Sequence, residues 1–177
     1  MSLTKKDKEE IKRLVAETMD EIREGKKYIA ECNEKYDLEL LTEKWNDSAI
    51  DTGLGFYIAP DNLKIGDKEY FTWDEAKEYE KKLESTGWRM PTVSEWTQMY
   101  GRFGIGEDGS DDPDALVSQL SLNWSGYSYG VYWSSTAQST SYAYNLYFGS
   151  SLVHPQHSDN KSDRGFNVRM IKDKEVR

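Results

Sequence analysis

Apolar residues recur at helical spacing through the first part of the chain. No proline interrupts the range Lys5–Tyr36, which is rich in charged residues. Steps of four and three residues separate eight seam positions: Ile11, Val15, Thr18, Ile22, Gly25, Ile29, Cys32 and Tyr36. This spacing predicts a long helix with one apolar seam, and residues 1–44 are interpreted as a helical extension of the domain that follows.

The sequence allows two packing partners for this seam, the globular domain or a second helix. Leu14, Met19 and Tyr28 widen it, which fits packing against a globular body as well as a coiled coil between chains. Thr18 and Gly25 weaken the coiled-coil interpretation because neither fills a hole, and glycine destabilises a helix by about 1 kcal/mol relative to alanine. A homo-oligomer formed through the helix is therefore one of two alternatives.

The apolar spacing changes from helical to alternating after Trp45, where a globular domain over 45–177 is expected to begin. Alternation predicts a strand over Gly53–Ala59. Gly66-Asp67 predicts a turn between two further strands at 63–65 and 69–71.

Two capping boxes predict two helix starts. In each box a Thr hydroxyl and a Glu carboxylate satisfy free backbone N–H groups, first at Thr72 with Glu75 and then at Thr92 with Glu95. The first helix is expected to run to Gly87. A third, short helix is predicted over Asp112–Leu120, with Asp as its cap and Pro113 at its first position.

The second half of the domain contains a long stretch without charge. From Ala115 to Ser158 there is no Asp, Glu, Lys or Arg, although charged residues make up 31% of the chain. Alternation within it, and after the charged loop expected at Asp159–Arg164, predicts strands at 131–135, 142–148, 152–154 and, half-buried, Phe166–Met170. Helices followed by short strands indicate an α+β fold.

Composition narrows the classes of partner. A net charge of -9 and a pI near 4.8 disfavour nucleic acid and anionic membrane. No apolar run approaches the roughly 18 residues that a membrane span needs, and the charged Met1–Glu10 has no secretory signal. Cys32 is the one cysteine, which excludes an intrachain disulfide and a Cys-rich zinc site.

Three motifs in order carry a family resemblance. They are GWRMPT at Gly87–Thr92 with Glu95-Trp96 after it, YWSST at Tyr132–Thr136, and GFNVR at Gly165–Arg169. With them the chain resembles the C-type-lectin-like domains in variable proteins of diversity-generating retroelements, over roughly Gly53–Lys172. The resemblance implies a C-type-lectin-like fold, with small twisted antiparallel sheets and two capped helices, carrying an N-terminal helical extension.

The resemblance also implies a function. A stable scaffold would carry a variable region, about 121–170, whose surface residues differ between copies and bind different partners. The ligand would be a protein or a cell-surface glycan, and the setting a phage receptor-binding protein on the virion or a binder on a cell surface. Cofactors are not expected.

Strand alternation selects the residues of the expected surface. Tyr144, Leu146 and Phe148 would share the core face of their strand, while Asn145 and Tyr147 would face outward. Tyr offers large contact area at little rotamer cost, and Ser and Asn offer adaptable hydrogen bonds, as in antibody paratopes. The predicted ligand-binding residues are Tyr127, Tyr129, Gln138, Ser139, Ser141, Tyr142, Asn145, Tyr147, Ser150, Leu152, His154, Gln156 and His157.

The sequence supports catalysis, a histidine metal site and a calcium site less than it supports ligand binding. The formylglycine-generating enzymes share this kind of fold but use cysteine in their C-terminal part, whereas Cys32 lies in the N-terminal helix, so catalysis is not expected. His154 and His157 flank Pro155 without an apparent third metal ligand, which favours surface binding over metal. Asp108 and its acidic neighbours favour a solvated loop over a calcium site, because Pro113 stands where an EF-hand needs Gly.

Two alternatives to a binding surface remain. The Ser/Tyr alternation would also arise in an ordinary antiparallel sheet with one solvated face, although such a face usually carries Lys or Glu. The other alternative is a structural or assembly domain, in which the N-terminal helix oligomerises and the Ser/Tyr face packs against a sister subunit.

Overall fold

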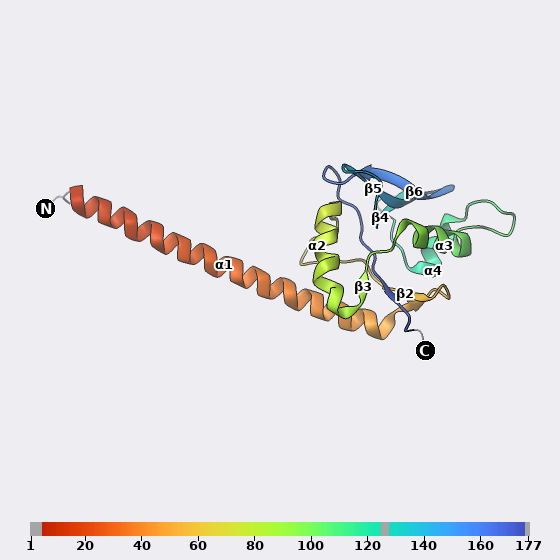
Figure 1. Cartoon of the computed structure of the whole chain (residues 1–177), viewed down its shortest axis with the longest axis horizontal. Helices are drawn as coiled ribbons and strands as arrows, with labels where there is room; N and C mark the ends of the chain where they lie inside the picture. Colours follow the sequence, from red (N-terminus) through yellow and green to blue (C-terminus); the bar gives the residue numbers. More distant parts are fainter. Residues whose placement is uncertain (1–4, 125–127, 176–177) are drawn as a thin grey trace. The chain divides into compact units, whose positions relative to one another are not determined.

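The computed structural model describes residues 5–124 and 128–175 (Figure 1). Its contacts divide the chain into two compact units, Met1–Asp37 and Leu38–Arg177. Helix α1 (Lys5–Ser48) confirms the predicted helix and continues twelve residues beyond it, through the domain boundary expected at residue 45. The continuation has a physical reason, because Leu38, Thr42 and Trp45 lie one helical turn apart and are all buried in the second unit.

Within its described residues, the second unit contains three further α-helices. They are α2 (Trp73–Leu83), which a short 3₁₀ turn at Glu84–Thr86 extends, α3 (Val93–Phe103) and α4 (Pro113–Leu120). Both predicted capping boxes are present with both of their hydrogen bonds. Asp112 caps α4 as predicted, its carboxylate accepting from the backbone N–H of Ala115 at 2.9 Å.

In the part of the unit that the structure describes, two antiparallel sheets join these helices, and the α+β class is confirmed. The four-stranded sheet has the order β1-β2-β7-β3. Its strands are β1 (Ile50–Asp51), β2 (Phe56–Ile58), β7 (Ile171–Asp173) and β3 (Trp88–Arg89). The three-stranded sheet has the order β4-β5-β6, with β4 (Tyr129–Ala137), β5 (Tyr142–Gly149) and β6 (Leu152–Asn160).

The first predicted strands are shorter than expected. Gly53 and Gly55 have φ angles of 67° and 94°, and this left-handed backbone leaves only Phe56–Ile58 extended. The expected pair of strands around the Gly66 turn reduces to one bridge between Ile65 and Lys68.

Strand β6 is longer than expected and includes the start of the predicted charged loop. It pairs with β5 along its whole length, from Leu152 opposite Gly149 to Asn160 opposite Tyr142. The pairing register shifts by one residue around Pro155, which forms a bulge. Proline has no backbone N–H to donate, and it is tolerated here because the bulge lies on an edge strand.

The closing segment differs most from its prediction. Phe166–Met170 was expected to be half-buried on one face, but Asn167, Val168, Arg169 and Met170 are all buried, and the strand itself begins at Ile171. The buried guanidinium of Arg169 donates to the carbonyls of Ala59 and Ser121, both at 2.7 Å. These carbonyl acceptors compensate for the burial, which lowers the pKa of Arg169.

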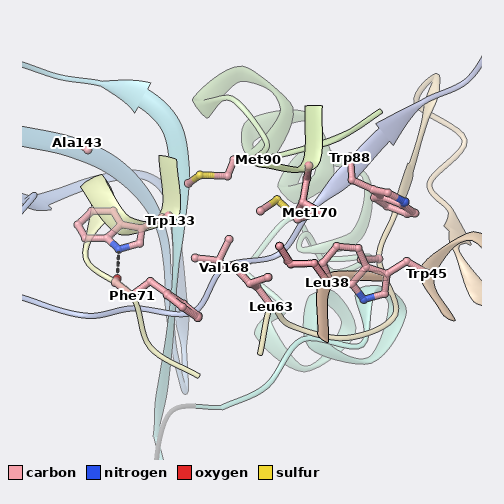
Figure 2. Packing of buried hydrophobic residues seen from close by; sticks show 13 residues of the cluster. Leu38, Trp45, Leu63, Phe71, Trp88, Met90, Trp133, Ala143, Val168 and Met170 are labelled. Atoms are coloured by element: carbon pink, nitrogen blue, oxygen red, sulfur yellow. Dashed lines mark hydrogen bonds between the residues drawn. The ribbon is translucent and has the colours of Figure 1, made fainter. Parts of the chain in front are cut away.

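Two clusters of buried side chains form the core of the second unit. The first cluster is drawn in Figure 2, where Val168 and Met170 lie between Trp133 and the pair of Trp45 and Trp88. The indole N–H of Trp133 donates to the carbonyl of Phe71 at 2.8 Å, the dashed line in Figure 2. The second cluster packs α3 and α4 against the three-stranded sheet. Of the helices in the described ranges, none is both long and apolar enough to cross a membrane.

Candidate ligand-binding surface

The three-stranded sheet has two chemically different faces. Tyr132, Leu146 and Phe148 point toward α3 and α4 and are fully buried in the second core cluster. The cross-strand register places Tyr147 opposite Val131 on β4 and opposite His154 on β6, so these three side chains share the other face. This second face carries the candidate surface.

Three aromatic rings gather at one end of that face, and we call Tyr129, Tyr147 and His157 the aromatic cluster. The rings of Tyr129 and Tyr147 are stacked, with centroids 6.2 Å apart and an angle of 13° between their planes. The His157 ring lies 5.5 Å from that of Tyr147. Tyr129 is 46% exposed and the His157 side chain 44%, so the cluster presents aromatic area to solvent.

Asn145 lies beneath the cluster and not on the surface. The prediction that it faces solvent is wrong, because it is fully buried. Its amide donates to Asp159 Oδ2 at 3.2 Å, and its Oδ1 lies 3.2 Å from His157 Nδ1. Since Asp159 Oδ2 is also 3.3 Å from His157 Nδ1, that nitrogen faces two acceptors and must carry a hydrogen. Asn145 and Asp159 thus fix the His157 ring.

A second group of predicted residues lies at the opposite end of the sheet, in the β4–β5 hairpin. Ser139 Oγ accepts from the backbone N–H of Ser141 and of Tyr142, and Gln138 donates its backbone N–H to the Tyr142 carbonyl. Lys161 donates to the Ser139 carbonyl at 2.9 Å and lies 4.3 Å from the Trp73 ring centre, which holds the hairpin in place.

The predicted surface therefore does not form one patch. Tyr142 and Tyr147 are five residues apart on β5, so strand alternation points them to opposite faces, about 17 Å apart along the strand. Tyr142 is exposed, but it lies with Gln138, Ser139 and Ser141 in the β4–β5 hairpin, and we call these four residues the hairpin patch. Tyr142 therefore cannot act together with the aromatic cluster on a small ligand.

The remaining predicted residues divide between these surroundings. Ser150 and Leu152 are exposed at the β5–β6 turn next to the cluster, where Leu152 pairs with Gly149, and His154 is exposed opposite Tyr147. Gln156 is directed toward α3, its amide donating to Thr97 Oγ1 at 3.4 Å. Tyr127 lies outside the described residues. Tyr144, expected in the core, is only half-buried.

The acidic loop before α4 has structural contacts for its carboxylates. Asp111 accepts from the Tyr100 hydroxyl at 2.6 Å and from the Val153 backbone N–H at 2.8 Å. The hydrogen bond from Tyr100, followed by that from Val153, lowers the pKa of Asp111, and the same bond raises the pKa of Tyr100. Asp108 accepts from Ser110. Within residues 5–124 and 128–175 no three His, Cys, Asp or Glu side chains group in a way that could hold a metal.

A polar hollow of about 410 Å³ lies elsewhere on the second unit and was missed by the sequence reasoning. Lys44 and Asp61 form an ion pair at its lining, and Asn62, Tyr70 and Trp124 contribute further polar and aromatic groups. The described residues that line it include none of the predicted ligand-binding residues. Its parts come from distant segments, so no local pattern in the sequence could have indicated it.

The chain was compared with family models, curated proteins and solved structures, and no match was found in any of the three.

Proposed function

We propose that this chain is a ligand-binding protein of C-type-lectin-like fold, a variable protein of a diversity-generating retroelement. It would bind a protein or a cell-surface glycan through the exposed face of the β4–β6 sheet, without changing the ligand chemically. Its setting would be a phage receptor-binding protein or a retroelement-diversified binder on a cell surface.

The aromatic cluster is the observation that carries this proposal. Stacked tyrosines on a rigid sheet offer a large, amphipathic contact area that loses little conformational entropy on binding. His157 is held from below by Asn145 and Asp159, so its ring is positioned before a ligand arrives. The neighbouring exposed residues, Ser150, Leu152 and His154, add hydrogen-bonding and apolar groups.

The location of the three sequence motifs supports the scaffold part of the proposal. Trp88 and Met90 of the first motif and Trp133 of the second are buried in one core cluster with Val168 of the third. Motif residues thus build the interior, while the exposed cluster lies mostly between the motifs in sequence. A fixed interior with an independent exposed face is what a diversified binder requires.

Sequencing many copies of this gene from one population tests the diversification. We expect differences to be concentrated at the codons for Tyr129, Tyr147, His157 and their exposed neighbours, and to be rare at the buried Trp88, Trp133 and Val168. Differences scattered evenly over exposed and buried codons would contradict the proposal.

The alternative is a structural or assembly domain whose N-terminal helix oligomerises and whose Ser/Tyr face is a subunit interface. The exposed tyrosine pair favours it as well, because aromatic residues are enriched in interfaces. Light scattering on the full chain separates the two functions. If the face binds a ligand, Tyr129→Ala with Tyr147→Ala leaves the mass unchanged. If it is a subunit interface, this double substitution lowers the mass.

A further inference from the structure

The apolar seam of α1 in the unit Met1–Asp37 has the spacing of a coiled coil. Taking Val15, Ile22 and Ile29 as heptad position a, the residues Ile11, Thr18, Gly25 and Cys32 occupy position d. At position a, the side chains of Val15, Ile22, Ile29 and Tyr36 are 57%, 47%, 60% and 61% exposed. Val15, Ile22 and Ile29 are β-branched, the residue type that two-stranded parallel coiled coils carry at position a together with Leu at position d.

Intrahelical ion pairs occupy the face of α1 that lies away from the seam. Arg13 pairs with Glu10 and Glu17, and a matching pair joins Arg23 to Asp20. All five residues fall at heptad positions b, c and f. Glu21 and Lys26 border the seam, at positions g and e, where their charges can decide how a second helix docks.

We propose that this seam binds the same seam of a second copy of the chain, parallel and in register. In a parallel pair each g residue faces the e residue five positions later in the other helix. Glu21 then meets Lys26 of the second copy, Leu14 meets Met19, and Tyr28 meets Asn33. Opposite charges thus face each other, and so do two apolar side chains.

An antiparallel pair of the same helices would bring different side chains opposite each other. Centring the overlap on the seam places e residues opposite e residues and g opposite g. Met19 would then face Lys26, and Glu21 would face Tyr28, so both charged groups would lose their partners. The order of residues beside the seam consequently selects the parallel arrangement.

Gly25, at position d, leaves open space beside the seam. A Cβ added at Gly25 would meet no atom of this chain within 4 Å, so the space beside it is free for a second helix. In register, Cys32 of one copy lies against Cys32 of the other. In an antiparallel pair the two cysteines would be about 25 Å apart along the axis, from a rise of 1.5 Å per residue.

Light scattering on the full-length chain tests the pairing. We expect the mass of a dimer for the unaltered chain and for Ala30→Asp, a control that adds the same charge at the outward position b. Ile22→Asp should give a monomer. Gly25→Leu, which fills the free space and favours the helix, should lower the concentration at which the dimer dissociates by about tenfold or more.

Mild oxidation of the full chain with diamide tests the direction of the helices. A parallel, in-register pair gives a Cys32–Cys32 cross-linked dimer on a non-reducing gel, and Cys32→Ser removes it. In light scattering, three results would overturn the proposal: a monomeric mass of the unaltered chain, a dimer that persists in Ile22→Asp, or a Gly25→Leu dimer no tighter than the original. A dimer that diamide does not cross-link would also overturn it.

Discussion

Trp133 and Tyr147 lie on neighbouring strands of one sheet, yet their surroundings give them different roles. Trp133 is completely buried, its indole N–H bonded to the Phe71 carbonyl and its ring 4.6 Å from that of Phe166. Tyr147 packs on the rings of Tyr129 and His157 and remains half-buried. At the scale of single residues, burial therefore separates the scaffold from the candidate surface.

Truncation of each residue should reveal that difference in stability. Trp133→Ala should lower the free energy of unfolding by roughly 3 to 5 kcal/mol, because it leaves a cavity and an unpaired carbonyl. Tyr147→Ala should change it by less than about 1 kcal/mol. Urea denaturation of both variants measures this, and equal losses would show that Tyr147 belongs to the core.

Binding should depend on the aromatic cluster and not on the hairpin patch. Tyr147→Ala should weaken binding by at least about tenfold, since a central aromatic anchor commonly contributes 2 kcal/mol or more. Tyr142→Ala, an exposed tyrosine at the other end of β5, is the matched control and should bind normally. An array of glycans and cell-surface proteins gives the measurement, and equal losses in the two variants would favour one continuous surface.

Alternation along β5 predicted which residues share a face but not how deep each would lie. It correctly placed Leu146 and Phe148 in the core and Tyr147 on the other face. It failed for Asn145, which lies on the outer face yet is covered by the cross-strand neighbours His157 and Asp159. Whether neighbouring strands bury such a residue depends on their pairing register, which cannot be predicted from the sequence of one strand.

At the scale of elements, one ion-pair network joins three of them. Arg89 on β3 binds Glu95 on α3 at 2.6 Å and Asp173 on β7 at 2.6 Å. Burial disfavours the charged form of Glu95, but hydrogen bonds from Arg89 and from the Thr92 backbone outweigh it and lower the pKa of Glu95. The same carboxylate closes the capping box, so it serves both the helix start and the contact between elements.

Glu95→Gln should therefore make stability less dependent on acid pH. Because the folded pKa is below the unfolded value of about 4.3, the native carboxylate stabilises the fold above that pH, and this contribution is lost as the pH falls through the folded pKa. At pH 7 the variant should be less stable by about 1 to 3 kcal/mol.

Urea denaturation between pH 7 and pH 2 provides the measurement for Glu95→Gln. The difference between variant and unaltered chain should shrink steadily below about pH 4. The exposed Glu107→Gln serves as the control and should follow the unaltered chain. A difference that stays constant with pH would mean that the Glu95 charge does not contribute.

Local chemistry predicted the helices of the second unit better than its strands. The two capping boxes and Asp112 located the starts of α2, α3 and α4 because caps act within four residues. The strand expected at Phe166–Met170 is instead a connecting segment whose backbone bonds to distant residues: Val168 to Leu63 and Met170 to Ala59, both more than a hundred positions earlier. Such partners are invisible to a pattern read along the chain.

At the scale of the whole molecule, the two units can be followed by separate probes. All six tryptophans lie in the unit Leu38–Arg177, at positions 45, 73, 88, 96, 124 and 133. Tryptophan fluorescence therefore reports on that unit alone, while circular dichroism at 222 nm includes the helical unit Met1–Asp37 as well.

Heating the full chain should give different results with these two probes. If α1 pairs with a second copy, the dichroism transition of the helix moves to higher temperature as protein concentration rises, by mass action. The fluorescence transition should not depend on concentration. Coincident transitions that ignore concentration would indicate that the helix does not pair.

The place of β7 in its sheet has a consequence for how the chain is made. β7 lies between β2 and β3, so until Ile171–Asp173 is synthesised β3 has no strand partner and β2 is paired only with β1. A frameshift or stop codon before Arg169 in the proposed variable region would remove Ile171–Asp173 and the buried Arg169 together. Mutated copies of the gene would then yield a folded product only when translation stays in frame to the end, so folding itself would discard the broken ones.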